Sequence, residues 1–217
     1  MNHFKPLDFD SGPLVWIDCE MTGLNPSKDK ILEVAVLITN GKLELVDPGI
    51  EFVVQTDKAS LDQMDEWCTK QHGSTGLTES CLQSPHTRDF VAQEVLSYVK
   101  KWIPKQRVGM LAGSSVHVDK LFLMNEMPEM IDWLHYRIVV SRSVQANYAG
   151  DGTQGPIHQK HCSVEITGWS LVSSLTPEES SLSTTTSPRA LDDIKGSIRE
   201  LQWYRDNIFK PPSPSRR

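Results

Sequence analysis

The sequence predicts an α/β domain, a mixed sheet flanked by helices, because strand-like and helix-like segments follow one another along its 217 residues. Three apolar, β-prone stretches come first, at 14–17, 31–39 and 43–55. The Asn40-Gly41 pair between the last two is typical of a hairpin, so we expect three neighbouring antiparallel strands.

The rest of the chain is mostly helical by its apolar periodicity and capping residues. We expect helices at 60–68, 77–82, 87–103, 116–126, 128–133 and 189–207, a turn at 72–76 and a strand at 108–112. Between 170 and 187, 11 of 18 residues are Ser or Thr, which predicts loop or disorder there. We therefore expect one folded domain at 14–209 with an atypical insert at 139–187, a lead at 1–13 and a tail at 210–217.

Composition excludes several classes of protein. The formal net charge of −6 argues against broad electrostatic binding to long nucleic acid, and no apolar run is long enough to span a membrane. The four cysteines form no CxxC pair, so neither a zinc site nor a disulfide framework is indicated. The N-terminus resembles neither a signal peptide nor an Arg-rich presequence, so we expect a cytoplasmic protein, with mitochondria as the alternative.

Two carboxylates follow the first strand. Asp18 and Glu20 are two residues apart, so in extended chain they share a face while Cys19 points away. Two neighbouring anions repel unless a cation lies between them, and carboxylate oxygens suit Mg²⁺ or Mn²⁺. The alternative is a pair of solvated acids at a strand end.

Two further acids open helices. Asp119 lies in the first turns of the helix after the 108–112 strand, and Asp193 lies at the start of the last helix, beside the apolar stripe. Acids are common in a first helical turn because the helix dipole favours them there, which is the alternative explanation for both. If all four acids converge at one edge of the sheet, they predict a two-metal site for phosphoryl chemistry.

Several motifs resemble the oligoribonucleases, a histidine-using branch of the DEDD group of 3′-to-5′ exonucleases. The first exonuclease motif corresponds to WIDCEMTGL at 16–24. Further matches, in the same order as in the family, are MDEW at 64–67, STGL at 74–77 with His72 before it, AGSSVHVD at 112–119, HYR at 135–137, RALDDI at 189–194 and ELQWYR at 200–205.

The resemblance implies a ribonuclease-H-like fold, a homodimer, and hydrolysis of short single-stranded RNA, from dinucleotides to small oligomers, to nucleoside 5′-monophosphates. It implies two Mg²⁺ or Mn²⁺ ions with four catalytic metal ligands, Asp18, Glu20, Asp119 and Asp193. It also implies five substrate-binding residues, of which Tyr136 would serve the partner subunit's site: Leu24, Trp67, His72, Ser115 and Tyr136.

Simpler roles exist for three of these substrate residues. Trp67 suits a core position, His72 suits a hydrogen bond to a backbone group in a turn, and Tyr136 suits an ordinary core or interface position.

One position departs from the family pattern. The family places a histidine five residues before its last metal-binding aspartate, and here that position is Pro188. Proline has no side-chain nitrogen, so the expected general base is missing, which impairs hydrolysis. The alternative function is a catalytically inactive homologue that binds metal and oligonucleotides.

Overall fold

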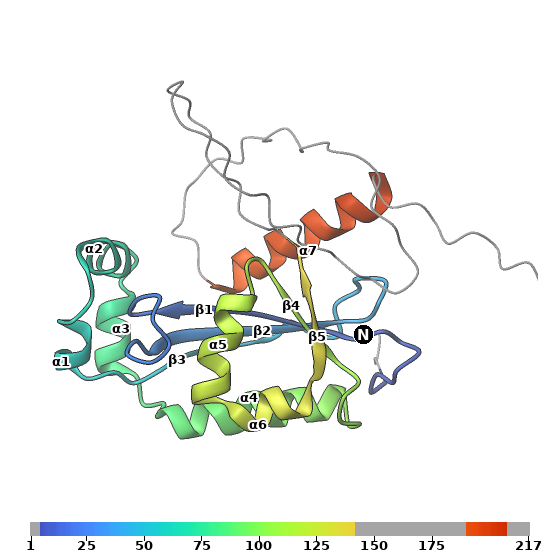
Figure 1. Ribbon diagram of the computed structural model, residues 1–217, viewed down its shortest axis with the longest axis horizontal. Coiled ribbons are helices and arrows are strands. Elements are labelled where there is room, and N and C mark those ends of the chain that lie inside the picture. The colour runs from blue at the N-terminus through green and yellow to red at the C-terminus, as the bar shows by residue number, and fades with distance from the viewer. Residues whose placement is uncertain (1–4, 142–189, 208–217) are drawn as a thin grey trace, which may run out of the picture.

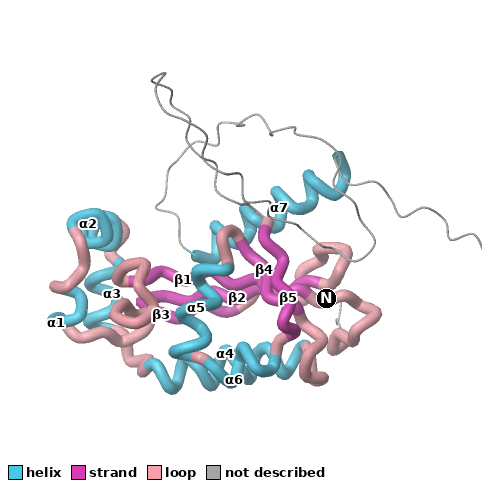
Figure 2. Tube along the Cα trace, in the orientation of Figure 1, coloured by secondary structure: helices cyan, strands magenta, loops and turns pink. Residues whose placement is uncertain are grey.

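The computed structural model describes residues 5–141 and 190–207, which form a five-stranded sheet between helices (Figures 1 and 2). The strands are β1 (Leu14–Met21), β2 (Ile31–Thr39), β3 (Ile50–Val53), β4 (Met110–Gly113) and β5 (His135–Val140). The helices are α1 (Lys58–Leu61), α2 (Glu66–Ser74), α3 (Leu77–Gln83), α4 (Arg88–Trp102), α5 (His117–Glu126), α6 (Pro128–Trp133) and α7 (Ala190–Asn207). Within these residues no helix has the length and apolarity needed to cross a bilayer.

The sheet is mixed, as the sequence predicts. Its order is β3-β2-β1-β4-β5, with β1 at the centre. Strand β2 pairs antiparallel with both β1 and β3, whereas β4 lies parallel to β1 and β5 parallel to β4. The three antiparallel neighbours expected at the start of the chain are confirmed.

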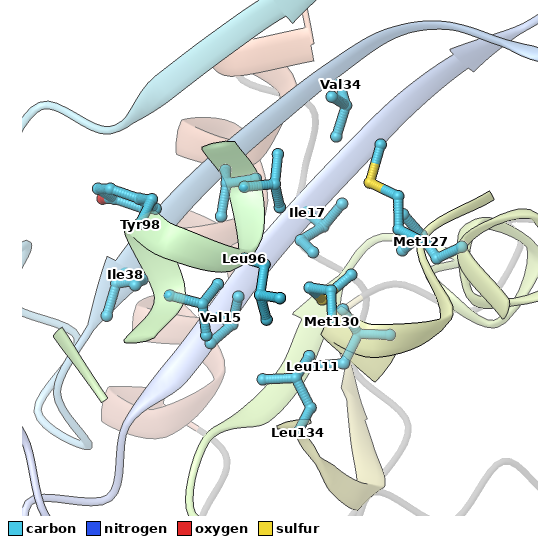
Figure 3. Packing of buried hydrophobic residues seen from close by; sticks show 14 of the residues in the cluster. Val15, Ile17, Val34, Ile38, Leu96, Tyr98, Leu111, Met127, Met130 and Leu134 are labelled. Atoms are coloured by element: carbon cyan, nitrogen blue, oxygen red, sulfur yellow. The ribbon is translucent and has the colours of Figure 1, made fainter. Parts of the chain in front are cut away.

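Alternation along β1 gives the sheet two different faces. Val15 and Ile17 point into the larger core, where they meet residues of α4 and α6 such as Leu96 and Met130 (Figure 3). Trp16 belongs to the other core cluster, and α7 covers that face (Figure 1). Because side chains alternate along a strand, the residues that follow at positions 18 and 20 continue the face covered by α7.

Helix α7 is held to the sheet by an apolar stripe. Ala190, Ile194, Ile198 and Leu201 are buried against Trp16 and other residues of that face of the sheet. Burying large aliphatic side chains stabilises a contact by about 1.5–3 kcal/mol each. This stripe therefore fixes where the first turn of α7 lies over the sheet.

Strand β1 is longer than expected. It does not end at Ile17 but runs to Met21, pairing Asp18 with Ala35 and Glu20 with Glu33 of β2. The apolar run alone does not indicate this extension. The polar residues after Ile17 are in strand conformation because they pair with the backbone of β2.

The second arm of the hairpin is shorter than expected. Only Ile50–Val53 of the predicted 43–55 stretch is strand, because the chain turns repeatedly before it. Leu43 has φ 67° and Gly49 has φ 87°, both in the left-handed region. The Asn40 side chain stabilises the turn by accepting hydrogen bonds from the Lys42 and Glu44 amides.

Two helical predictions near the site also need correction. The predicted helix at 60–68 is broken, because Asp65 accepts a hydrogen bond from the Cys68 amide and caps a new helix, α2. Helix α2 continues through His72, so the turn predicted at 72–76 is confined to its end, where Gly76 has φ 75°.

The fifth strand was not expected from the residue pattern. Strand β5 starts with the polar residues His135 and Arg137 and pairs with β4 through Ile138 and Val139. The insert predicted at 139–187 therefore begins too early, since Val139 is buried in the sheet. The remainder of that prediction, at 142–187, lies outside the described residues, as do the lead at 1–4 and the tail at 210–217.

Removing part of the α7 stripe tests its contribution. Ile198→Ala leaves a cavity against the sheet, so we expect a loss of about 2–4 kcal/mol in the free energy of unfolding, and about 1 kcal/mol for Ile198→Val. Urea unfolding followed by circular dichroism measures both. Arg199→Ala on the exposed side of α7 is the control, expected within about 0.5 kcal/mol of the original protein. An Ile198→Ala loss no larger than that control would show that α7 is not packed on the sheet.

Candidate active site

Three carboxylates from two distant parts of the chain meet on the face of the sheet under α7. Asp18 and Glu20 come from β1 and Asp193 from the first turn of α7, and one ligand oxygen of each lies within 4.8 Å of the others. Asp18 and Glu20 are half-buried, whereas Asp193 is exposed. The extended backbone gives the first two a common face, and the α7 stripe brings the third to them.

Asp119 lies beside this group and is buried. It sits in the first turn of α5, and its Oδ1 accepts a hydrogen bond of 3.0 Å from the backbone N–H of Cys19. Strand β4 pairs with β1 only as far as Trp16, so an amide farther along β1 needs another acceptor. The hydrogen bond fixes the Asp119 carboxylate next to the strand that carries Asp18 and Glu20.

The turn that leads into α5 is built for close approach. A Cβ at Gly113 would lie 2.7 Å from the Ile17 carbonyl oxygen, so only glycine lets the chain pass β1 at this distance. Ser115 has φ 48°, an uncommon conformation for a residue with a side chain. Such strain is often found at functional sites, and here it lies four residues before Asp119.

The four carboxylates have raised pKa values. Burial, followed by the charges of Asp119 and Asp193, raises the pKa of Asp18 to about 8. Burial and then the charge of Glu33 raise the pKa of Glu20 to about 7. Burial also raises the pKa of Asp119, to about 6, against the opposing effect of the Cys19 amide, and it raises the pKa of Asp193.

Among the described residues, the charges that raise the pKa values of Asp18, Glu20 and Asp193 are those of other carboxylates. A divalent cation placed among the carboxylates removes the repulsion that keeps protons on them. Hard carboxylate oxygens are the ligands that Mg²⁺ and Mn²⁺ take, so the donor set fits such an ion. The cluster of acidic residues can therefore bind metal.

Glu33 is a further acid at the site that the sequence analysis did not select. It is only 3% exposed and lies opposite Glu20 in the β1–β2 register. Its signal in the sequence is that it is the single charged residue in the apolar stretch Ile31–Thr39. Burying a carboxylate is costly unless it is paired, so a charged residue in this buried strand points to a specific role at the site.

His72 lies on α2 at the same end of β1. Its Nε2 is 2.9 Å from the Met21 carbonyl oxygen and donates to it, and its Nδ1 is 4.0 Å from Glu20 Oε2. The predicted hydrogen bond from His72 to a backbone group is confirmed, although His72 lies in a helix and not in a turn. Glu20, Glu33, His72 and Leu77 line an open polar pocket.

Three predicted substrate residues are on the surface. Leu24 is 80% exposed, Trp67 is 70% exposed and Tyr136 is 66% exposed. A core role for Trp67 or Tyr136 is therefore wrong. Tyr136 lies on the edge strand β5, where it stacks on His135 and beneath Arg137. Exposure leaves these side chains accessible to a ligand.

Comparison with known proteins agrees with the motifs. A family model described as Exonuclease, RNase_T, matches residues 15–201. A probable oligoribonuclease of Schizosaccharomyces pombe is 40% identical, covering 89% of this chain and 67% of its own. An oligoribonuclease of Arabidopsis thaliana is 39% identical, covering 91% and 79%, and a mitochondrial oligoribonuclease of Homo sapiens is 38% identical, covering 91% and 73%.

Among solved structures, Escherichia coli exonuclease I in complex with a dA16 oligonucleotide covers 56% of this chain and 26% of that chain. It is 15% identical with a TM-score of 0.46, too low for any detail to be carried across. The family match, by contrast, spans most of the chain, and the relatives are similar over nearly all of it. The resemblance predicted from the motifs is therefore confirmed, and the chain belongs to the exonuclease family that includes the oligoribonucleases.

Proposed function

We propose that this chain is a metal-dependent 3′-to-5′ exoribonuclease of the oligoribonuclease type, which hydrolyses short RNA to nucleoside 5′-monophosphates. The observation that carries the proposal is the meeting of Asp18, Glu20 and Asp193, with ligand oxygens within 4.8 Å. The names of the relatives, oligoribonucleases from fungi, a plant and mammals, support the same reaction and substrate class.

The metal ions of the proposal are two Mg²⁺ or Mn²⁺ ions. Asp18, Glu20, Asp119 and Asp193 would hold them, with Asp119 oriented by the Cys19 amide. When bound, such ions stabilise negative charge on phosphate oxygens and activate water for attack. The fold gathers the ligands, buries Asp119 and half-buries Asp18 and Glu20, which strengthens their attraction for a cation.

Three substrate-binding residues of the proposal, Leu24, Trp67 and Tyr136, are exposed, whereas His72 is buried. Leu24 and Trp67 present apolar surface to bases, and stacking contributes about 1–3 kcal/mol per base with little regard to sequence. His72 lies on α2 and contacts the end of β1, the strand that carries Asp18 and Glu20. Ser115 lies in the turn before α5, the helix that carries Asp119. Tyr136 would act in the site of a second copy, in a homodimer.

The proposed location is the cytoplasm or the mitochondrion. The second choice is supported by relatives from Saccharomyces cerevisiae, Bos taurus and Homo sapiens whose names include "mitochondrial".

A second candidate function follows from Pro188. This residue lies outside the described part of the chain, and the motif resemblance assigns it the position of the family's histidine. Without a general base, the chain would bind metal and short RNA but turn substrate over slowly. Dinucleotide binding without cleavage would favour this binder over the enzyme.

Removing one proposed ligand tests the metal site. Asp193→Asn should abolish the rise in melting temperature caused by Mn²⁺ and reduce cleavage of a labelled RNA dinucleotide by more than about 100-fold, since even supporting residues of metal sites contribute 10- to 100-fold. Asp192→Asn is the matched control, because this neighbouring carboxylate points away to pair with Lys195 at 3.0 Å. Equal effects of the two variants would contradict the assignment of Asp193.

The raised pKa values predict a pH dependence. The carboxylates at 18, 20 and 119 hold protons in the folded protein at a pH where they lose them in the unfolded chain. Their contribution to metal-free stability therefore falls as pH rises from about 4 to about 8. A metal ion reverses this, so the rise in melting temperature caused by Mg²⁺ should be larger at pH 8 than at pH 6. Thermal unfolding with and without Mg²⁺ measures this rise in melting temperature. A rise that is no larger at pH 8 than at pH 6 would contradict the close packing of the acids.

Restoring the histidine tests the missing base. Pro188→His should raise the rate of dinucleotide cleavage by about 10²- to 10⁴-fold, the usual contribution of a general base. Pro188→Ala controls for the loss of proline alone and should not raise the rate. If the unaltered chain already cleaves as fast as Pro188→His, Pro188 does not impair it. If neither cleaves but both bind, the chain is a binder.

A further inference from the structure

The loop between β1 and β2 carries Leu24 and is internally ordered. Thr22 begins it, and the Thr22 amide donates to the Lys30 carbonyl oxygen at 3.0 Å, which closes the base of the loop. The Thr22 side chain is buried, yet Leu24, two residues later, is 80% exposed. The buried Thr22 therefore fixes the base of the loop, from which the Leu24 side chain extends into solvent.

Asp29 is the residue on which this loop is organised. Its Oδ1 accepts a hydrogen bond of 3.1 Å from the Thr22 hydroxyl, and its Oδ2 accepts one of 2.9 Å from the Asn25 amide. The Thr22 hydroxyl in turn accepts from the Lys30 amide at 3.1 Å. The Asp29 carboxylate therefore joins the residues on both sides of Leu24.

Gly23 leaves space for this carboxylate. A Cβ at Gly23 would lie 2.5 Å from Asp29 Oδ2, 2.7 Å from its Cγ and 2.9 Å from its Oδ1. The carboxylate thus occupies the place where any other residue would put its side chain. This close fit explains a glycine directly before Leu24, even though its φ is not in the left-handed region.

The outer end of the loop is also fixed. The Pro26 carbonyl oxygen accepts a hydrogen bond of 2.8 Å from the Asn125 side chain, near the end of α5. Helix α5 carries Asp119 in its first turn, so one helix contacts both the acidic site and the loop. At the start of β2, Glu126 accepts from the Ile31 amide at 3.0 Å.

We propose that Asp29 is a positioning residue for substrate, which holds the 22–30 loop so that Leu24 is presented in one place to the bases of short RNA. The inference rests on the proposed function, because it requires Leu24 to contact substrate. A loop ordered in advance avoids the cost of ordering it on binding, so the effect is on affinity and not on the chemical step.

The test is a double-mutant cycle between positions 24 and 29. Asp29→Ala should raise the KM for an RNA dinucleotide by about tenfold with kcat within about twofold, as expected from the ordering cost of a few residues. In a Leu24→Ala background the same change should raise KM by less than about twofold, because the side chain that Asp29 presents is gone. Gly23→Ala should reproduce Asp29→Ala, since its methyl group displaces the carboxylate.

Asp8→Ala is the matched control. Asp8 accepts hydrogen bonds from the Ser11 amide and hydroxyl, so it stabilises a turn of similar kind in the segment leading into β1. It should leave KM unchanged. The rise in melting temperature caused by Mn²⁺ should persist in Asp29→Ala, which shows that the variant is folded and keeps its metal ligands.

The outcomes separate the inference from the proposed function. Equal KM effects of Asp29→Ala in the two backgrounds, or a loss confined to kcat, would overturn the inference alone. If the unaltered protein does not cleave, the same cycle is read from binding of a fluorescently labelled RNA dinucleotide in Ca²⁺, with the same expected ratios. If the unaltered protein neither cleaves nor binds the dinucleotide, the proposed function is refuted, and the inference with it.

Discussion

The repulsion among the carboxylates at the end of β1 is the constraint on which the arrangement of the site depends. The fold forces Asp18 and Glu20 onto one face, adds Asp193 from α7 and buries Asp119 beside them. Without a cation, the pKa of Asp18 is raised to about 8 and that of Glu20 to about 7, so these two carboxylates retain protons near neutrality. The apolar packing of the rest of the domain opposes this repulsion, so part of the stability of the core is used to keep a cation-binding site open.

The site combines rigid and exposed parts. The acids lie on strands and helices whose backbones are fixed by pairing and packing, which gives them a defined geometry. The apolar residues that would face bases, Leu24 and Trp67, project into solvent from a loop and from the first turn of α2. Polar hydrogen bonds inside the chain, and not apolar packing, hold the loop, which leaves its Leu24 side chain free for a ligand.

Part of this site could be predicted from the sequence. The two-residue spacing of Asp18 and Glu20 predicts a shared face, because alternation in a strand is a local property. The convergence of Asp193 on them is not local, since it depends on where the α7 stripe settles, and only the family motifs indicated it. The role of Glu33 and the presence of β5 could not be predicted for the same reason. Glu33 lies opposite Glu20 of β1, and β5 is a strand because it pairs with β4, and both partners are distant in the chain.

Helix α7 is attached to the sheet by its own apolar side chains, which limits how much the connection that precedes it matters for its position. The location of Asp193 is set by that contact and not by the covalent connection from β5. Closing a connection of twice the length costs only about 0.6 kcal/mol more. A change in the length of the connection would therefore leave Asp193 in place as long as Ala190, Ile194 and Ile198 keep their contact with the sheet.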